Sequence, residues 1–249
     1  MYRFFVAPEA ISEKEVQITG DDVNHIKNVL RMAPGEEVVV SCGRGLDYEC
    51  VIHEVKDSMV LLDIKEIKPA VTELPVRITL FQALPKKDKM EFVIQKAIEL
   101  GAAEIVPVQT KRCIVKLDAK KEEKKLQRWR TIAESAAKQS GRAVVPEIHS
   151  VLTMKEALDY GVDIQTRLIP YELCEDMVGS VSAMKKAAEG ESIGIFIGPE
   201  GGFERSEIED AMAAGVVPIS LGKRILRTET AGLATLSVLM FMIEGSGKE

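Results

Sequence analysis

Residues 193–203 read Ile-Gly-Ile-Phe-Ile-Gly-Pro-Glu-Gly-Gly-Phe, and this stretch decides the fold. Its apolar first half is typical of a buried strand, and the glycines that follow permit a tight turn. We predict that a helix opens just beyond, at Ser206, with Glu209 completing a capping box. The order of strand, glycine turn and helix indicates a ligand crevice at the carboxyl end of a sheet.

The spacing of these glycines excludes the common nucleotide-binding motifs. It fits neither G-x-G-x-x-G nor G-x-x-x-x-G-K-[ST], so we do not expect an ordinary dinucleotide or ATP site. A turn of this kind is also found as a simple tight connection, so it needs a second feature to define a site.

The second feature is residues 221–231, which read Leu-Gly-Lys-Arg-Ile-Leu-Arg-Thr-Glu-Thr-Ala. They lie between a predicted strand at 216–220 and a last helix that is apolar nearly all round, which predicts a buried helix. Two such loops at the carboxyl ends of successive strands would face one crevice. Arg227 and Glu229 then either act on a ligand or form an internal ion pair, because charges beside a buried helix need partners.

Strand and helix patterns alternate through the rest of this part of the chain, which indicates an α/β domain with a mainly parallel sheet. We predict strands at 78–83, 105–108 and 168–170, and helices at 88–100, closed by Gly101, and at 126–139. Pro69 and Pro75 frame a linker. We therefore place a domain boundary near residue 70, which gives domains 1–70 and 71–249.

The first 70 residues have a different pattern. Short β-type runs at 37–41, 49–55 and 59–64 alternate with turn residues, which predicts a small β-barrel. One helix interrupts them at 21–32, with Asp21 or Asp22 as its cap and with one apolar face formed by Val23, Ile26, Val29 and Leu30.

Composition narrows the class of protein. The 249 residues are 46% hydrophobic and 29% charged, as in folded globular proteins. The 4 cysteines form no C-x-x-C pair, which argues against a zinc ribbon, a redox motif or a disulfide framework, and we expect no metal site. Neither a signal peptide nor a membrane span is evident, so we expect a cytoplasmic protein without a membrane anchor.

The formal net charge of -6 conceals a basic segment. Residues 111–130 carry nine basic and three acidic side chains, a local balance of +6. Clustered cations of this kind bind the phosphates of nucleic acid. A solvated helix with Glu and Lys pairs produces the same pattern, so the segment alone leaves both interpretations open.

With its two glycine loops, the sequence resembles a known family, the bacterial small-subunit ribosomal RNA uridine-N3 methyltransferases (RsmE) of the SPOUT superfamily. The resemblance spans essentially the whole chain, and residues 198–203 and 221–231 are its most specific parts. Departures occur at Lys87 and Lys223, where Gly and Pro are expected, at Cys113 in place of Ser, and at Lys138 in place of an acid. The weaker matching segments are 3–5, 29–32 with His25 and Gly35, 89–101, Arg112 with 115–116, 139–140 with Arg142, and 171–172.

The resemblance implies a fold, a cofactor and partners. The fold would be a PUA-like or OB-like β-barrel followed by a SPOUT-type α/β methyltransferase domain, whose carboxyl end is threaded into a trefoil knot. The cofactor would be S-adenosylmethionine, and the substrate a uridine of 16S ribosomal RNA, presented in an assembled small subunit. The protein would be a homodimer with its last helix in the interface.

The resemblance also implies which residues form the site. The predicted cofactor-binding residues are Tyr171, Glu172, Ile197, Gly198, Pro199, Glu200, Gly201, Leu221, Gly222, Ile225, Leu226, Thr230 and Ala231. For RNA, clustered cations on the barrel and the basic surface lead us to predict contacts from Arg3, Arg31, Lys89, Arg112 and Arg142.

Methylation of uracil N3 requires loss of a weakly acidic proton, so a fixed cation would favour the reaction. We predict that Arg227 stabilises the uracil oxygens and that Glu229 orients Arg227; Glu200 or water is the base. The 3 histidines all lie outside the two loops, so the sequence gives little support for a histidine base.

Two alternative functions stay open, a SPOUT ribose 2'-O methyltransferase and a non-catalytic RNA-binding or ribosome assembly protein.

Overall fold

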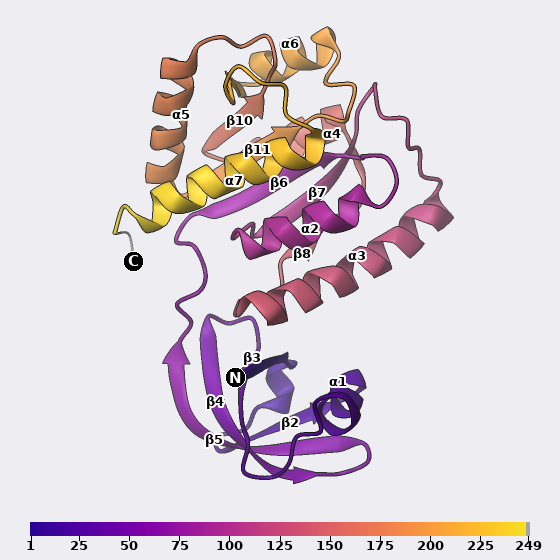
Figure 1. The fold of residues 1–249 in the computed structure, drawn as a ribbon, viewed down its shortest axis with the longest axis vertical. Helices are drawn as coiled ribbons and strands as arrows, with labels where there is room; N and C mark the ends of the chain where they lie inside the picture. The colour runs from indigo at the N-terminus through magenta and orange to yellow at the C-terminus, as the bar shows by residue number, and fades with distance from the viewer. Residues whose placement is uncertain (248–249) are drawn as a thin grey trace. The chain divides into compact units, whose positions relative to one another are not determined.

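The structure is a computed structural model that describes residues 1–247 (Figure 1). Its internal contacts divide the chain into two compact units. The first unit comprises Met1–Glu73 with Ala137–Val145, and the second comprises Leu74–Ala136 with Pro146–Glu249. The chain therefore returns to the first unit at 137–145, which no pattern in the sequence indicated.

The first unit is built on a five-stranded sheet in the order β1-β3-β4-β5-β2. Its β1 and β3 run parallel, and the other neighbours are antiparallel. Register shifts between β4 and β5 let this long hairpin bend around an apolar core that includes Phe4, Ile26 and Leu62. The strands are β1 (Tyr2–Phe5), β2 (Glu15–Thr19), β3 (Glu37–Ser41), β4 (Leu46–Val55) and β5 (Met59–Pro69).

The helix predicted at 21–32 is only partly correct. The structure has a short α1 (Asp21–Asn24) that continues as a π-helix, η2 (His25–Leu30), and Gly20 rather than an aspartate is the N-cap. The wider π turn rotates Val29 out of the apolar face, and this side chain is 61% exposed. Arg31 ends the helix in the left-handed conformation, with φ 54°. A single turn of 3-10 helix, η1 (Pro8–Ala10), precedes β2.

The second unit contains a fully parallel sheet in the order β12-β10-β11-β6-β7-β8, with β9 also paired to β7. This confirms the predicted parallel α/β domain. The central strands β6 and β11 are almost entirely buried. The strands are β6 (Arg77–Ala83), β7 (Glu104–Gln109), β8 (Glu147–Ile148), β9 (Leu152–Thr153), β10 (Thr166–Pro170), β11 (Ser192–Ile197) and β12 (Val217–Ile219).

Helices cover both faces of this sheet (Figure 1). On one face, Gly232 of α7 lies over side chains of β6 and β11. On the other face, Phe81 and Phe196 stack at 4.2 Å and pack into one cluster with residues of α4 and α6. The helices are α2 (Lys89–Glu99), α3 (Ala119–Ser140), α4 (Met154–Tyr160), α5 (Met177–Glu189), α6 (Arg205–Ala213) and α7 (Thr228–Glu244).

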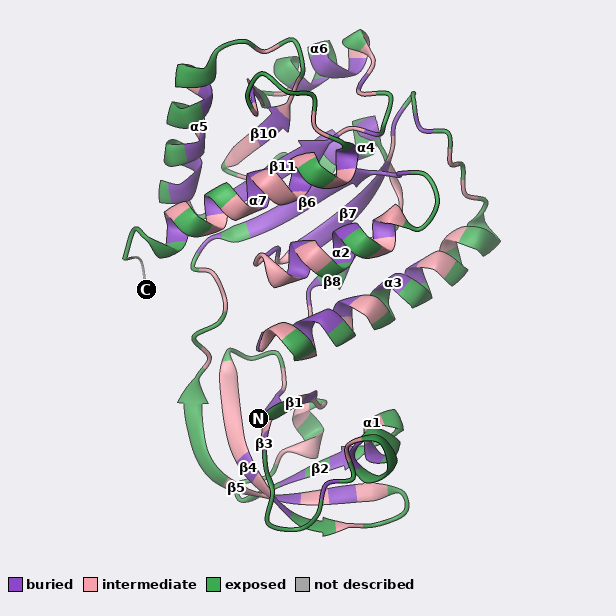
Figure 2. Cartoon of the chain, in the orientation of Figure 1, coloured by how far each residue is buried: buried purple, intermediate pink, exposed green. Residues whose placement is uncertain are grey.

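Two predictions about helices are corrected. The helix predicted to open at Ser206 has Glu204 as its N-cap, in a capping box with Glu207, because these two side chains and not those of Ser206 and Glu209 reach the free backbone N–H groups. The last helix is not buried all round. The sheet and neighbouring helices cover one side of α7, and Phe241 on the other side is 78% exposed (Figure 2).

Other boundaries lie close to their predicted places. Gly101 follows α2 with φ 89°, as a glycine after a helix end should. The helix predicted at 126–139 is an exception, since it begins well before its predicted start, at Ala119, and includes the second half of the basic segment. Among residues 1–247, no helix has the length and apolar character needed to span a membrane.

Candidate functional site

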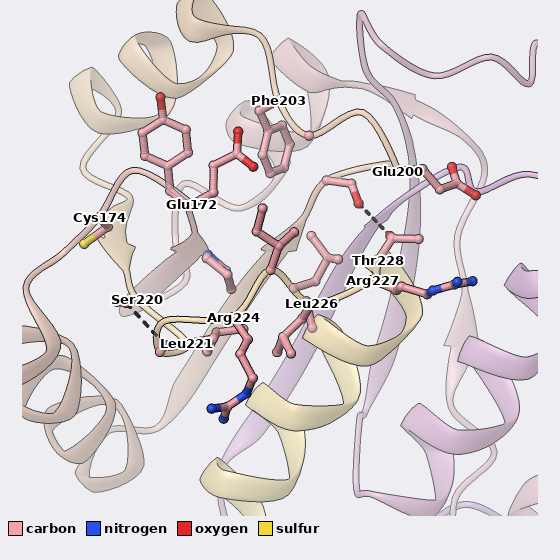
Figure 3. Close-up of a pocket in the computed structure, with 18 of the residues that line it drawn as sticks. Glu172, Cys174, Glu200, Phe203, Ser220, Leu221, Arg224, Leu226, Arg227 and Thr228 are labelled. Atoms are coloured by element: carbon pink, nitrogen blue, oxygen red, sulfur yellow. Dashed lines mark hydrogen bonds between the residues drawn. The ribbon is translucent and has the colours of Figure 1, made fainter.

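Three loops at the carboxyl ends of strands surround one pocket of about 950 Å³ in the second unit (Figure 3). They are the β10 loop (residues 171–176), the β11 loop (198–204) and the β12 loop (220–227). They meet because β10 lies between β11 and β12 and all three strands are parallel. The volume is at the upper end of the range of about 300–1,000 Å³ that is usual for cofactor pockets.

Most of the predicted cofactor-binding residues lie together in the wall of this pocket. Those that line it are Tyr171, Glu172, Ile197, Gly198, Pro199, Glu200, Leu221, Gly222, Ile225, Leu226 and Ala231. Gly201 and Thr230 do not line it. Arg227 does, and so does Lys89, which was predicted to contact RNA instead.

The β11 loop is held firmly by side chains around it. Phe203 is 7% exposed, and its ring lies 3.1 Å from the point where a Cβ on residue 198 would stand, so a side chain there would press on the ring. The Thr228 hydroxyl donates to the Gly198 carbonyl at 2.6 Å and accepts from Gln82 Nε2 at 2.9 Å. Arg112 Nη1 donates to the Gly201 carbonyl at 2.9 Å.

The β12 loop has a more open structure. Its Gly222 has φ 100°, a left-handed conformation that favours glycine, and no atom would obstruct a Cβ there. Ser220 anchors the start of the loop, since its N–H donates to Ser180 Oγ at 2.8 Å. Beyond it the loop is exposed, and Ile225 is 85% exposed. The pocket therefore has one packed wall and one open wall.

A cluster of charges lies at the rim between the β11 loop and α7. Lys89 Nζ is 3.1 Å from Glu229 Oε2 and 3.3 Å from Glu200 Oε1. The hydrogen bond that Lys89 donates to Glu229, together with the second carboxylate of Glu200, raises the pKa of Lys89. Burial opposes ionisation of both carboxylates, but backbone N–H groups and Lys89 outweigh it, so the pKa values of Glu200 and Glu229 lie below their ordinary value.

The structure does not bring Arg227 and Glu229 together as predicted. Among the described residues, Glu229 has its hydrogen bond with Lys89, and Arg227 acts on it only through charge, which helps to lower the pKa of Glu229. Arg227 is exposed rather than buried. In Figure 3 its side chain extends to the same side of the pocket as Glu200. An internal Arg227–Glu229 pair is therefore not a feature of this fold.

The five arginine and lysine side chains predicted to contact RNA have different surroundings. Arg3 is bound by Ser41 and by Asp47, with Nη2 2.8 Å from Asp47 Oδ2, and its side chain is 10% exposed. Arg142 is 5% exposed and bound by Glu73. Arg31 and Arg112 are exposed, although Arg112 also contacts Glu204 at 2.9 Å.

The basic segment is helical from Ala119 onward, and some of its side chains form ion pairs. Arg128 donates to Glu91 at 2.7 Å, and Lys121 lies 2.9 Å from Asp118. Among residues 1–247, no three His, Cys, Asp or Glu side chains gather as a metal site would require.

The sequence did not indicate how some residues at the site are used. Gln82 is inside a strand, yet it donates to the Thr228 hydroxyl that holds the β11 loop, and Phe203 lies in the glycine turn, but nothing local showed that its ring would pack beside Gly198. Lys87, where the family pattern has glycine, adopts φ 59°. The lysine therefore keeps the left-handed backbone that glycine would adopt without strain.

Two known domain families match the chain. Residues 72–240 match the RNA methyltransferase domain, and residues 18–64 match the RNA methyltransferase PUA domain. The chain is 37% identical to ribosomal RNA small subunit methyltransferase E of Bacillus subtilis (strain 168), over 98% of both proteins. It is 33% identical to the protein of the same name from Synechocystis sp., over 98% of this chain and 78% of that protein.

A solved structure shows the same arrangement. The crystal structure of a ribosomal RNA small subunit methyltransferase E from Neisseria gonorrhoeae, bound to S-adenosyl methionine, aligns with a TM-score of 0.85. The two proteins are 34% identical, and the alignment covers 96% of each chain.

Proposed function

Because the chain belongs to the family of ribosomal RNA small subunit methyltransferase E, we propose that it methylates a uridine of 16S ribosomal RNA at base N3. It has the SPOUT-type α/β fold of these enzymes after a PUA-like barrel. The observation that carries the proposal is the single pocket formed by the β10, β11 and β12 loops, which contains most of the residues expected around the cofactor.

The pocket fits S-adenosylmethionine. Gly198 and Gly222 leave backbone close to the cavity, and the apolar side chains of Ile197, Leu221 and Leu226 line a slot suited to an adenine ring. We therefore assign the cofactor to the space between the β11 and β12 loops. S-adenosylmethionine supplies a methyl group that its sulfonium already activates.

Arg227 is our candidate for the group that assists the chemistry. If the pKa of uracil N3 lies about two units above ambient pH, forming its anion costs about 2.7 kcal/mol. The exposed guanidinium at the pocket rim could donate to the uracil oxygens as negative charge develops on them. The proton passes to the ionised Glu200 or to water.

The substrate uridine must be unpaired or flipped, because its N3 edge is hidden in a base pair. We propose that the PUA-like unit binds the surrounding RNA, with exposed Arg31 contributing, and that Arg112 adds a contact from the second unit. Arg3 and Arg142 remain candidates, although Asp47 and Glu73 already balance their charges. The substrate would be an assembled small subunit in the cytoplasm, where bacterial ribosomes form.

We also propose that the protein is a homodimer through α7. Phe241 and Val238 are 78% and 41% exposed on this helix, which leaves an apolar face that a second copy would cover. Light scattering on the purified protein tests this, because Phe241→Glu should shift a dimer to a monomer.

Mass mapping of ribosomal RNA tests the function itself. We expect 16S RNA from cells that lack this protein to lose one base-methylated uridine, and expression of the protein to restore it. A missing ribose methyl group would instead indicate a 2'-O methyltransferase. A purified protein that binds RNA but shows no S-adenosylmethionine binding by calorimetry would indicate a non-catalytic assembly protein.

A further inference from the structure

Lys89 has an unusual position for a lysine. It is the first residue of α2, where the positive end of the helix dipole disfavours a cation. Two carboxylates offset this, since Lys89 Nζ lies 3.1 Å from Glu229 Oε2 and 3.3 Å from Glu200 Oε1. The lysine therefore has specific partners rather than a free ammonium group.

The partners of Lys89 belong to two different elements beside the pocket. Glu200 is part of the β11 loop, and Glu229 lies in the first turn of α7, directly after the β12 loop. Glu200 Oε1 also accepts from the Lys86 N–H at 3.0 Å. Residues 86–89 thus hold the β11 loop through Glu200, while Thr228 holds it from α7 through the Gly198 carbonyl.

The balance of charge distinguishes this cluster from a phosphate site. One ammonium faces two carboxylates, so a phosphate approaching Lys89 would meet net negative charge from Glu200 and Glu229. The side chains of Lys89, Glu200 and Glu229 are 28%, 26% and 18% exposed. Solvent and salt therefore screen their interactions less than those of charges on an open surface. Arg227 adds a positive charge near Glu229 but makes no hydrogen bond to it among the described residues.

We propose that Lys89 is a positioning residue for methyl transfer, which fixes the β11 loop and the start of α7 at the separation that the cofactor pocket requires. It acts through Glu200 and Glu229 and does not contact RNA. This proposal rests on the proposed function only where methyl transfer is measured. The affinity for the cofactor can be measured without any RNA.

The proposal predicts a specific dependence on pH. The charged groups that face the ammonium are Glu200 from the β11 loop and Glu229 from α7, with Arg227 near Glu229. Without Lys89 the two carboxylates repel each other, and at least one of them binds a proton more readily. The acid limb of the single-turnover rate should then move to higher pH.

The test compares Lys89→Met, which keeps length and removes charge, with Lys89→Arg, which keeps charge. We expect Lys89→Met to weaken S-adenosylmethionine binding at least about tenfold by calorimetry and to shift the acid limb upward. Lys89→Arg should restore most of both. RNA affinity and its dependence on salt should stay as in the wild type.

Two outcomes would overturn the proposal. One is unchanged cofactor affinity and an unchanged acid limb in Lys89→Met. The other is a reduced salt slope of RNA binding with normal cofactor affinity, which would make Lys89 a phosphate contact. If Lys89→Met does not fold, Glu200→Gln and Glu229→Gln replace it, and normal cofactor affinity in both would overturn the proposal. If the wild type binds the cofactor but methylates no RNA, the proposed function fails while the affinity test of Lys89 still stands.

Discussion

The β11 and β12 loops face the same pocket but obtain their shapes in different ways. The β11 loop is fixed by its neighbours, namely the Phe203 ring, the Thr228 hydroxyl and the Arg112 guanidinium. The β12 loop is largely exposed and depends on the backbone conformation of Gly222. Glycine therefore serves two purposes. Gly198 lets the Phe203 ring approach the backbone of the β11 loop, and Gly222 allows a left-handed backbone in the β12 loop.

Because one loop is packed and the other exposed, the two loops can contribute differently to binding. A packed loop provides a rigid wall that can preorganise a cofactor, whereas an exposed loop can adjust when substrate enters. Substitutions should therefore act through steric conflict in the β11 loop and through backbone strain in the β12 loop. The predictions below test that contrast.

The largest effect is expected at Arg227, where the β12 loop ends. Arg227→Ala should lower the single-turnover rate about 10²–10³-fold, as for loss of one electrostatic donor. Because the side chain is exposed, the melting temperature should change little. Raising the pH should recover part of the rate, since a larger fraction of the uracil is then already ionised. A normal rate in a destabilised variant would remove Arg227 from the chemistry.

The next largest effect is expected at Gly198 in the packed loop. In Gly198→Ala the new methyl group meets the Phe203 ring at 3.1 Å, so the ring must give way by a few tenths of an ångström and disturb the loop that it packs against. We expect S-adenosylmethionine affinity to fall about tenfold, which corresponds to about 1.4 kcal/mol. Gly201→Ala is the matched control, because the atoms that its new Cβ meets belong to Arg112 and the nearest, Arg112 Cβ, is at 3.5 Å, an ordinary contact. Equal losses in both variants would show that Phe203 does not define this wall.

A smaller effect is expected at Gly222 in the open loop. Gly222→Ala meets no atom within 4 Å but must hold φ near 100°. We expect a loss of stability of about 1–2 kcal/mol from this strain. Gly222→Asn should lose less, because asparagine tolerates left-handed backbone better than alanine. If urea unfolding gives the two variants the same stability, backbone strain is not the cause.

The smallest effect on the fold is expected at Ile225. Because it is 85% exposed, Ile225→Ser should leave the free energy of unfolding within about 0.5 kcal/mol of the wild type. It lines the pocket, so cofactor affinity measured by calorimetry should still fall a few-fold. A large loss of stability would mean that the β12 loop is packed more tightly than its exposure indicates.

The sequence predicted the elements whose patterns are local. β3 occupies the predicted residues 37–41 because the buried Val38 and Val40 alternate with the less buried Glu37 and Val39. β1 and β2 were missed, since their pairing depends on distant strands, β3 and β5. The π-helix at His25–Leu30 also has no simple periodicity that would identify it.

Prediction of the site followed the same rule. The glycine loops identified the pocket because loop composition is a local signal. The partner of Glu229 could not be predicted, because Lys89 is 140 residues away and the nearer Arg227 offered a plausible pair. The ion pairs of Arg3 with Asp47 and of Arg142 with Glu73 have the same origin, since only the folded chain brings these side chains together.

The central claim is that the pocket between the two loops methylates a uridine base. It is tested most directly by incubating small ribosomal subunits from cells that lack this protein with the purified protein and methyl-labelled S-adenosylmethionine, followed by mass analysis of the digested 16S RNA. We predict label at N3 of one uridine with the wild type, and none within the same time with Arg227→Ala. Label on a ribose, or no label from a protein that binds the cofactor, would contradict the claim.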